Sequence, residues 1–350
     1  MKKLEEGFTT GSCAAACALA SCLWRARGEC PERVEVLVPG GRWYRPEIHP
    51  LGRFCCGVYK EAGDDPDITD GAEVWAQAEP LGADGPVRFC GGEGVGTVTR
   101  PGLKLPVGEP AINPVPRRMI EEAVRQVFPR EAVRVTVGIT NGRELARKTF
   151  NPRLGIEGGL SVLGTTGIVR PMSEEALMDS IRLELEQKRA EKVREVGLVF
   201  GSQGEEALLA LRPGLPCVQI SNYVGFAMEA CLELGYSRVL LAGQPGKLVK
   251  VAGGCMQTHS RWGDGRRETL CAHLALMGAP RALLEKVMDS VTLEGLVPEI
   301  KEAGYSGVWN VLCRRAGGYC MARTRGELKV DTLMFDRDGT LLGAFEGGES

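Results

Sequence analysis

Histidine is scarce in this chain, which has only three: His49, His259 and His273. Transition-metal sites need several imidazole or thiolate ligands close together, so this scarcity argues against a multi-histidine metal centre. The sequence also lacks any Cys-x-x-Cys pair, the spacing typical of zinc ribbons and of thioredoxin-like redox motifs. We therefore expect no metal site in the protein itself.

Two further absences limit the partners that we expect. No apolar run reaches the length of a membrane span, and the formal net charge is only −2, so neither a membrane nor a nucleic acid is indicated. The start, Met-Lys-Lys, is not followed by the apolar core of a signal peptide. With no export signal, the odd count of 13 cysteines predicts reduced, mostly buried thiols and a cytoplasmic location.

The length and composition are those of a globular protein with more than one core. The chain has 350 residues, of which 43% are hydrophobic and 25% charged. A single core of this size is uncommon, so we expect two domains and a small C-terminal addition. We predict an α+β domain at 1–170, an α/β cofactor-binding domain at 171–300, and a C-terminal helix with a closing strand at 301–350.

Residues 149–177 form the most distinctive stretch. Five glycines lie between Gly155 and Gly167, and the sequence Gly-Thr-Thr-Gly at 164–167 follows a short apolar run at 160–163 that we predict to be a strand. Ser173 then has the features of a helix N-cap. Such a loop is either a structural connection or a ligand-facing loop, and we favour the second, with Thr165 and Thr166 contacting a cofactor.

Other segments of the first half allow two interpretations each. The alanine-rich stretch at 7–16 predicts a helix capped by Thr10 or Ser12, which either is plainly capped or binds an anion. The acidic stretch at 60–71 is either a turn with side-chain caps or a site that orients a cationic ligand group. The glycines at 91–96 do not open a helix, which excludes a dinucleotide fingerprint and favours a tight hairpin near a ligand. We predict strands at 133–139 and 145–150.

Strands and helices alternate in the second half. Apolar runs at 196–200, 218–221 and 239–242 are each followed by a loop and a helical pattern. This rhythm predicts a Rossmann-like, mostly parallel sheet, which binds ligands at the carboxyl ends of its strands. We therefore expect the cofactor to contact residues of the first and third loops: Gly201, Gly204, Glu205 and Gly243.

The densest polar cluster lies at 258–268. His259 and Asp264 are candidate acid and base groups, and Arg261 could hold a carboxylate. The alternative is a solvated helix start. Near the C-terminus, Asp-Arg-Asp-Gly-Thr at 336–340 imitates the haloacid dehalogenase nucleophile motif, but too little chain follows for that fold, so we predict a turn.

Eight motifs, in order, resemble one family. The sequence resembles the CbiD family, the cobalt-precorrin-5B C1-methyltransferases of the anaerobic cobalamin pathway, nearly from end to end. The motifs that carry this resemblance are Gly-Phe-Thr-Thr-Gly-Ser-Cys-Ala-Ala-Ala at 7–16, Ala-Gly-Asp-Asp-Pro-Asp-Ile-Thr-Asp-Gly at 62–71, Gly-Gly-Glu-Gly-Val-Gly at 91–96, Gly-Glu-Pro-Ala-Ile-Asn-Pro-Val-Pro-Arg at 108–117, the stretch 149–177, Ser-Asn-Tyr-Val-Gly at 221–225, Gly-Lys-Leu-Val-Lys at 246–250 and Thr-His-Ser-Arg at 258–261.

The resemblance implies methyl transfer from S-adenosyl-L-methionine to ring carbon C1 of cobalt-precorrin-5B, giving cobalt-precorrin-6A. Cobalt would then enter only as part of the substrate. Glu205 would accept hydrogen bonds from the ribose hydroxyls of the cofactor. Basic residues within the matched motifs or close to them would bind the carboxylate arms of the tetrapyrrole. These residues are Arg100, Arg117, Arg153, Lys247 and Arg261.

Two other functions remain compatible with the sequence. A nicotinamide-dependent reductase of the same pathway would also use a parallel sheet, but it would bind NAD(P)H and no S-adenosyl-L-methionine. A non-catalytic tetrapyrrole carrier would bind the substrate without turning it over. A homo-oligomeric state is also left open.

Overall fold

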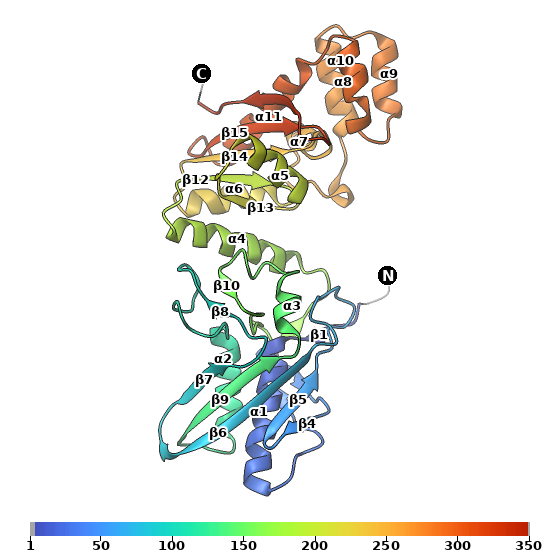
Figure 1. Ribbon diagram of the computed structural model, residues 1–350. Coiled ribbons are helices and arrows are strands. Elements are labelled where there is room, and N and C mark those ends of the chain that lie inside the picture. Colours follow the sequence, from blue (N-terminus) through green and yellow to red (C-terminus); the bar gives the residue numbers. More distant parts are fainter. Residues whose placement is uncertain (1–3, 349–350) are drawn as a thin grey trace. The chain divides into compact units, whose positions relative to one another are not determined.

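The computed structural model describes residues 4–348 and divides the chain into two compact units, Met1–Glu174 and Glu175–Ser350 (Figure 1). The domain boundary expected after residue 170 lies close to this division. The first unit has one large core cluster, and the second has a large cluster and a smaller one on opposite faces of its sheet. Both units combine helices with multi-stranded sheets.

The first unit is built on a five-stranded sheet in the order β4-β5-β6-β9-β7. Neighbouring strands are antiparallel except β7, which runs parallel to β9. Side chains alternate along the strands, so that Val74, Ala76 and Ala78 of β6 all enter the core. The strands are β4 (His49–Gly52), β5 (Cys55–Tyr59), β6 (Glu73–Asp84), β7 (Val87–Gly91) and β9 (Glu131–Ile139).

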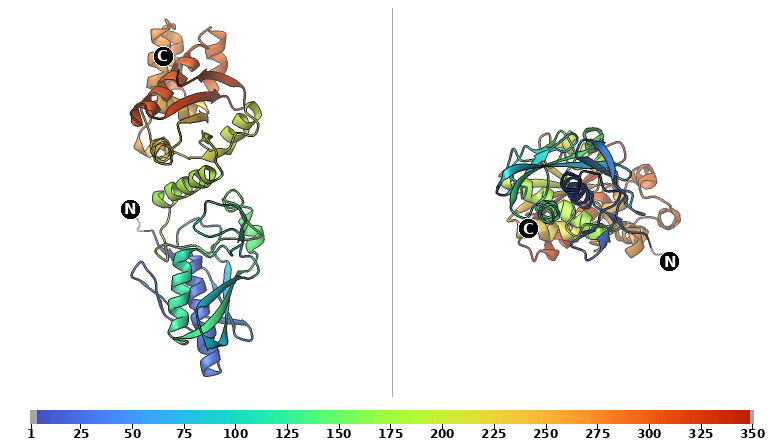
Figure 2. Two further views of the ribbon diagram at one scale, coloured as in Figure 1. Left: turned by 90° about the vertical axis from the view of Figure 1, so that its left-hand side faces the viewer. Right: turned by 90° about the horizontal axis from the view of Figure 1, so that it is seen from below.

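Two helices, α1 (Thr10–Arg27) and α2 (Pro114–Arg125), pack against each other and against this sheet (Figure 2). Five alanines of α1 are fully buried, and their small size lets the helix lie close to β6: Ala14, Ala15, Ala16, Ala18 and Ala20. The cap of α1 is Thr9, whose side chain accepts from the backbone N–H of Ser12, and not Thr10 or Ser12 as predicted. The Gly11 N–H donates to Leu163 O, so the chain itself uses this helix start.

The connections of the first unit correct three predictions. The 145–150 strand is wrong, because α3 (Gly142–Ala146) and a turn occupy this segment. The 91–96 hairpin is also wrong, since β7 pairs with β9 whereas β8 pairs with β10. Residues 160–163 form only isolated bridges instead of a strand. The remaining short strands are β1 (Gly7–Phe8), β2 (Val36–Leu37), β3 (Trp43–Tyr44), β8 (Thr97–Val98), β10 (Ile156–Glu157) and β11 (Ile168–Val169).

The second unit contains a five-stranded sheet in the order β13-β12-β14-β15-β16. Its first four strands are parallel, as the alternating pattern predicts, and β16 is antiparallel at the edge. The strands are β12 (Glu195–Val199), β13 (Cys217–Gln219), β14 (Arg238–Gly243), β15 (Lys329–Phe335) and β16 (Leu341–Phe345). The segment expected as a separate C-terminal addition lies within this unit, because β15 pairs with β14.

Helices cover both faces of this sheet. Helices α4, α6, α7 and α11 contribute to the large core cluster, whereas α5 packs on the opposite face against Val199, Leu240 and Ala242. The 336–340 turn is confirmed, since Asp336 Oδ1 accepts from the N–H groups of Asp338 and Thr340 between β15 and β16. The helices are α4 (Glu174–Ala190), α5 (Ser202–Leu211), α6 (Val224–Glu233), α7 (Pro245–Ala252), α8 (Arg266–Leu276), α9 (Arg281–Asp289), α10 (Val297–Glu302) and α11 (Val308–Arg323).

Candidate active site

The loops at the carboxyl ends of β12 and β14 meet at one edge of the second sheet. A side-chain carbon at Gly204, in the first turn of α5, would lie 3.7 Å from the Ala242 carbonyl oxygen and 3.9 Å from the Gly243 Cα. The structure therefore brings the predicted residues Gly201, Gly204 and Gly243 together. The strand order reverses at this edge, because β13 and β14 lie on opposite sides of β12.

The three glycines differ in what surrounds them. A Cβ at Gly243 would lie 2.5 Å from the Phe200 ring, so this glycine makes room for the core. Gly201 has extended backbone and no atom within 4 Å of its Cβ position. Gly204 would meet only ordinary contacts. Gly201 and Gly204 are therefore the two that leave space at the sheet edge.

Glu205 also reaches this edge from α5. Its Oε2 accepts from Nε2 of Gln219, the last residue of β13, at 2.7 Å. Gln203, in the first turn of α5, contacts Gln244, which directly follows β14. The Nε2 atom of Gln244 donates to Gln203 Oε1 at 3.3 Å. Side-chain amides thus join α5 to both neighbouring connections.

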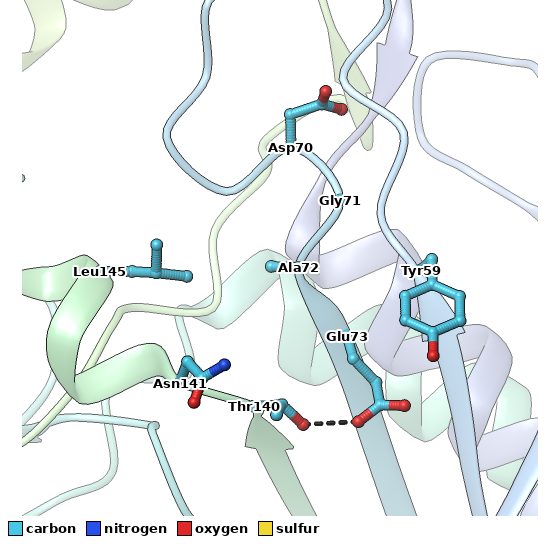
Figure 3. Close-up of a pocket in the computed structure, with 8 residues that line it drawn as sticks. All are labelled: Tyr59, Asp70, Gly71, Ala72, Glu73, Thr140, Asn141 and Leu145. Atoms are coloured by element: carbon cyan, nitrogen blue, oxygen red, sulfur yellow. Dashed lines mark hydrogen bonds between the residues drawn. The ribbon is translucent and has the colours of Figure 1, made fainter.

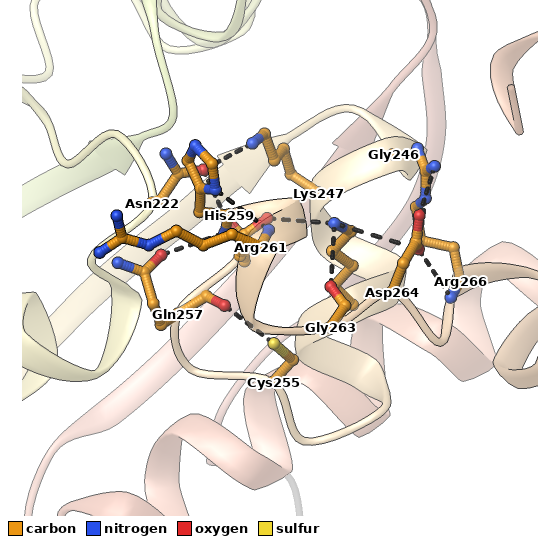
Figure 4. Close-up of polar contacts among 12 residues, drawn as sticks. Asn222, Gly246, Lys247, Cys255, Gln257, His259, Arg261, Gly263, Asp264 and Arg266 are labelled. Carbon is orange, nitrogen blue, oxygen red and sulfur yellow. Dashed lines mark hydrogen bonds and ion pairs between the residues drawn. The ribbon is translucent and has the colours of Figure 1, made fainter. Parts of the chain in front are cut away.

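Three motifs that are distant in the sequence converge on Asn222 (Figure 4). Its Oδ1 accepts from Lys247 Nζ at 2.6 Å and from the Thr258 hydroxyl at 3.0 Å. Burial lowers the pKa of Lys247, and the positive charges of Lys250 and Arg266 lower it further. We assigned no role to Asn222 from the sequence, although the motif at 221–225 contains it. Ser221, in the left-handed region at φ 49°, sets the turn that places Asn222.

Asp264 is held by cations. Its carboxylate accepts two hydrogen bonds from the Arg266 guanidinium, at 2.7 and 2.6 Å, and lies 4.0 Å from the buried Lys250 Nζ. The hydrogen bonds from Arg266 hold the pKa of Asp264 below its usual range. A carboxylate kept ionised in this way is a poor proton donor. The geometry therefore gives Asp264 a positioning role and disfavours its predicted acid/base role.

His259 and Arg261 lie on an exposed turn, the 3₁₀ helix Ser260–Trp262 (Figure 4). The Nδ1 atom of His259 accepts from the Arg261 backbone N–H at 3.2 Å. In the neutral ring the proton is therefore on Nε2, which is a donor. The Arg261 guanidinium lies over the Trp262 ring, with its Cζ atom 5.0 Å from the ring centroid.

The remaining predicted residues lie in the first unit. The exposed Thr166 exchanges hydrogen bonds with the backbone of Ile168, and Thr165 beside it is also exposed. The glycines that flank them pack against the start of α1, since a Cβ at Gly164 would overlap Thr9. The geometry thus favours a structural connection here, and these threonines belong to another unit than Gly201.

The predicted substrate arginines of the first unit have different surroundings. The Arg117 guanidinium donates to the carbonyl oxygens of Ile112 and Pro110 and to the Glu109 carboxylate, so the chain itself uses it. The side chain of Arg100 runs over Gly155, while Arg153 is half-buried in the same loop region.

Comparisons with known proteins identify the family to which these motifs belong. A family model described as CbiD matches residues 1–171, and one described as the CbiD C-terminal domain matches residues 257–346. The chain belongs to the CbiD family. A relative from Alkaliphilus metalliredigens named cobalt-precorrin-5B C(1)-methyltransferase is 41% identical, covering 97% of this chain and 92% of its own. Relatives with the same name from Desulfitobacterium hafniense (97% of this chain, 89% of its own) and Moorella thermoacetica (99% and 96%) are 42% and 41% identical.

One solved structure is also similar to this CbiD chain. It is the crystal structure of a cobalamin biosynthesis protein (cbiD) from Archaeoglobus fulgidus, with 25% identity, a TM-score of 0.40, and coverage of 76% of this chain and 84% of that one. Among residues 4–348, no helix is both long and apolar enough to cross a membrane. No group of three His, Cys, Asp or Glu side chains in that range is placed to hold a metal ion.

The acidic CbiD motif at 62–71 is mostly occupied by its own turn. Asp67 accepts from the buried Lys60 Nζ at 2.7 Å, and Asp70 accepts from the Ala62 N–H at 2.8 Å. Asp64 and Asp65 likewise accept from backbone N–H groups, of Glu5 and Met172. These bonds support the interpretation as a turn with side-chain caps over the cationic-ligand interpretation.

The motif nevertheless borders an acidic cavity of about 350 Å³ (Figure 3). Glu73 lines it, accepting from the Thr140 hydroxyl at 2.6 Å and lying 2.8 Å from His49 Nε2. Burial raises the pKa of Glu73, but these hydrogen bonds outweigh it and leave the pKa lowered. The sequence did not reveal this cavity, because its walls come from separate strands and from α3.

Proposed function

We propose that this chain is a cobalt-precorrin-5B C1-methyltransferase that uses S-adenosyl-L-methionine as the methyl donor and forms cobalt-precorrin-6A. The observation that carries the proposal is the 41% identity, over 97% of this chain, to a relative named cobalt-precorrin-5B C(1)-methyltransferase. The contacts of Asn222 with Lys247 and Thr258, which bring the family motifs at 221–225, 246–250 and 258–261 together, are compatible with it. The end-to-end similarity to relatives that bear this enzyme name supports it.

The second unit would act as a Rossmann-like cofactor domain. Ligands of open parallel sheets bind outside the carboxyl ends of the strands, at the point where the strand order reverses. Here that point lies at the loops of Gly201 and Gly204, which leave space, with the Glu205 carboxylate nearby for hydroxyl groups of a ribose. These residues fit an adenosyl group, which would bring the sulfonium that carries the transferable methyl group.

The basic residues beside these loops would hold the substrate. Lys247 and Arg261 are cations that could pair with carboxylate arms. Lys250 donates to the Thr258 carbonyl oxygen and lies near Asp264, and these contacts hold the segment that carries Arg261. Transfer from a sulfonium to carbon is an in-line displacement and depends mainly on alignment of the two reactants. His259, with its proton on Nε2, would donate a hydrogen bond to the substrate.

A direct assay tests this function. The protein is incubated with cobalt-precorrin-5B and S-adenosyl-L-methionine, and mass spectrometry follows the macrocycle and S-adenosylhomocysteine. We expect the macrocycle to gain one methyl group for each S-adenosylhomocysteine formed. Calorimetry with NADPH serves as the control for a reductase. Binding of NADPH without S-adenosyl-L-methionine would support the reductase, and substrate binding without turnover would support a carrier.

A further inference from the structure

The helix α3 of the first unit borders a second cavity, of about 310 Å³, whose character is the opposite of the acidic one. Arg143 and Ala146 of α3 line it together with Arg147, the residue that caps the end of this helix. The facing wall comes from the glycine-rich stretch and includes Pro152, Ile156 and Glu157. Leu145 of the same helix lines the acidic cavity, so this short helix separates two cavities.

Glycine contacts build this cavity from three distant segments. A Cβ atom at Gly142 or at Gly159 would overlap the carbonyl oxygen of Gly94. The backbones of these three glycines therefore touch, and only glycine permits this approach. The pairing of β8 with β10 adds a second link between the 91–98 and 152–159 segments. The positions of the two arginines relative to the facing loop thus follow from backbone packing.

The two arginines are available to a ligand. They lie four residues apart on α3, so both project from one side of the helix. Among the residues that the structure describes, neither guanidinium has an ion-pair or hydrogen-bond partner. The one carboxylate of the lining, Glu157, accepts from the Thr99 hydroxyl at 3.2 Å. The lining therefore contains two guanidinium groups and one carboxylate, and it keeps a positive charge.

The floor of the cavity is apolar. Ala146 and Ile156 are each only 5% exposed, and Pro152 lies beside them. An apolar floor under two forked donors suits a ligand with carboxylates attached to a flat carbon framework. A cavity of 310 Å³ is at the lower end of the range for small-molecule sites, so it would hold one part of a large ligand.

We propose that this cavity binds a carboxylate side arm of the tetrapyrrole, with Arg143 and Arg147 as the anchoring cations and the adjoining ring edge over Ala146 and Ile156. This inference rests on the proposed function for the identity of the ligand. Arg100 strengthens the positive charge near the cavity, because its side chain runs over Gly155 of the same loop. The site would set which edge of the macrocycle the first unit holds.

The test uses the full-length protein and a stable probe, cobalt uroporphyrin, which carries acetate and propionate arms. Its affinity is measured by absorbance titration at low and at high salt. Replacing both arginines by glutamine (Arg143→Gln with Arg147→Gln) should weaken binding by about tenfold or more at low salt, and by less at high salt, because these charges are exposed. The double lysine variant, which keeps the charge but loses the fork, should fall between.

Arg27→Gln is the matched control, since this exposed arginine at the end of α1 lies at the other end of the unit from α3 (Figure 1). It should bind the probe like the wild type. Thermal unfolding of each variant separates lost binding from lost folding. If the wild-type protein does not bind the probe, or if the folded double glutamine variant binds it equally well, the proposal is overturned.

The same proteins separate this inference from the proposed function. If the wild type methylates its substrate while the double variant binds and turns over normally, the cavity has no such role and the enzyme function stands. If the probe depends on the two arginines but no methyl transfer is found, the site stands and the proposed function fails.

Discussion

Lys247 and Asn222 are 25 residues apart in the sequence, yet Lys247 Nζ lies 2.6 Å from Asn222 Oδ1. The lysine comes from the first turn of α7 and the asparagine from the loop after β13. Because the Thr258 hydroxyl shares the same acceptor, one amide oxygen joins the start of α7 to two loops. The protonation state of Lys247 should therefore affect the free energy of unfolding.

The protonated form of Lys247 should cost stability. Burial lowers its folded-state pKa, so the folded protein binds this proton less tightly than the unfolded chain does. The cost is fully present below the folded pKa and disappears as the pH rises from that value to the ordinary lysine pKa of about 10.4. We expect Lys247→Met to raise the free energy of unfolding at neutral pH, with a gain that shrinks in alkali.

Urea denaturation over a pH series measures this effect. The exposed Lys301 of α10 provides the control, because Lys301→Met should leave stability almost unchanged. A loss of stability in Lys247→Met at neutral pH would mean that the hydrogen bond to Asn222 outweighs the cost of burial.

Asp264 should matter for stability and not as a titrating catalyst. Its pKa is lowered in the folded state, so its contribution is present above the unfolded pKa of about 3.9 and is lost as the pH falls through the folded value. We expect Asp264→Asn to lose about 1 kcal/mol at neutral pH, a small value because the pair is partly exposed. The difference should vanish in strong acid, and the pH profile of turnover should keep its shape.

His259 can be tested atom by atom. Its Nδ1 accepts from Arg261, and its Nε2 is the proposed donor to the substrate. Asparagine can replace the acceptor and glutamine the donor. We expect His259→Gln to keep more of the turnover than His259→Asn, which should lose roughly 10²-fold at similar substrate affinity. Equal turnover in wild type and both variants would make this residue part of a solvated turn.

Arg261 offers a separate measurement of the substrate side. Arg261→Ala should weaken tetrapyrrole binding by about ten- to a hundredfold while cofactor affinity stays the same, since the two ligands would use different groups. A parallel loss of affinity for S-adenosylhomocysteine would instead place Arg261 at the cofactor.

A substitution at Gly201 tests the proposed cofactor site. Because no atom lies within 4 Å of its Cβ position and its backbone is extended, Gly201→Val should fold normally. We expect calorimetry with S-adenosylhomocysteine to show at least about tenfold weaker binding, since the added side chain would enter the cofactor space. Gly52→Val, at an equally open position in β4, is the control. Unchanged affinity would move the cofactor site away from this edge.

The sequence indicated much of the second unit because buried apolar runs alternate there with loops and helical patterns. It failed where tertiary contacts decide the structure. The strand predicted at 145–150 was wrong because its first four residues, Leu-Ala-Arg-Lys, are good helix formers. The left-handed Asn141 and the packing of Gly142 on Gly94 set the start of α3 just before it. β16 was missed because its short apolar run gains its structure by pairing with β15.

The candidate site was predicted in its parts and not in its connections. The glycines at 201, 204 and 243 could be expected together, since the carboxyl ends of parallel strands meet at one sheet edge. No periodicity links Asn222 to Lys247 or Asp264 to Lys250, because each pair depends on how separate loops fold over the sheet. The separation of Thr165 and Thr166 from Gly201 was already implied by the boundary expected after residue 170, and the structure places them in different units.

The alkylation of buried cysteines can be used to follow the unfolding of this chain. Of its 13 cysteines, eight are buried. Burial raises the pKa of Cys22, Cys231, Cys313 and Cys320 to about 12. Since the thiolate is the reactive form, these groups should be nearly inert to alkylating reagents until the chain opens. Because buried thiols occur in both units, mapping the alkylated peptides would show which half of the molecule opens first, even in a crude lysate.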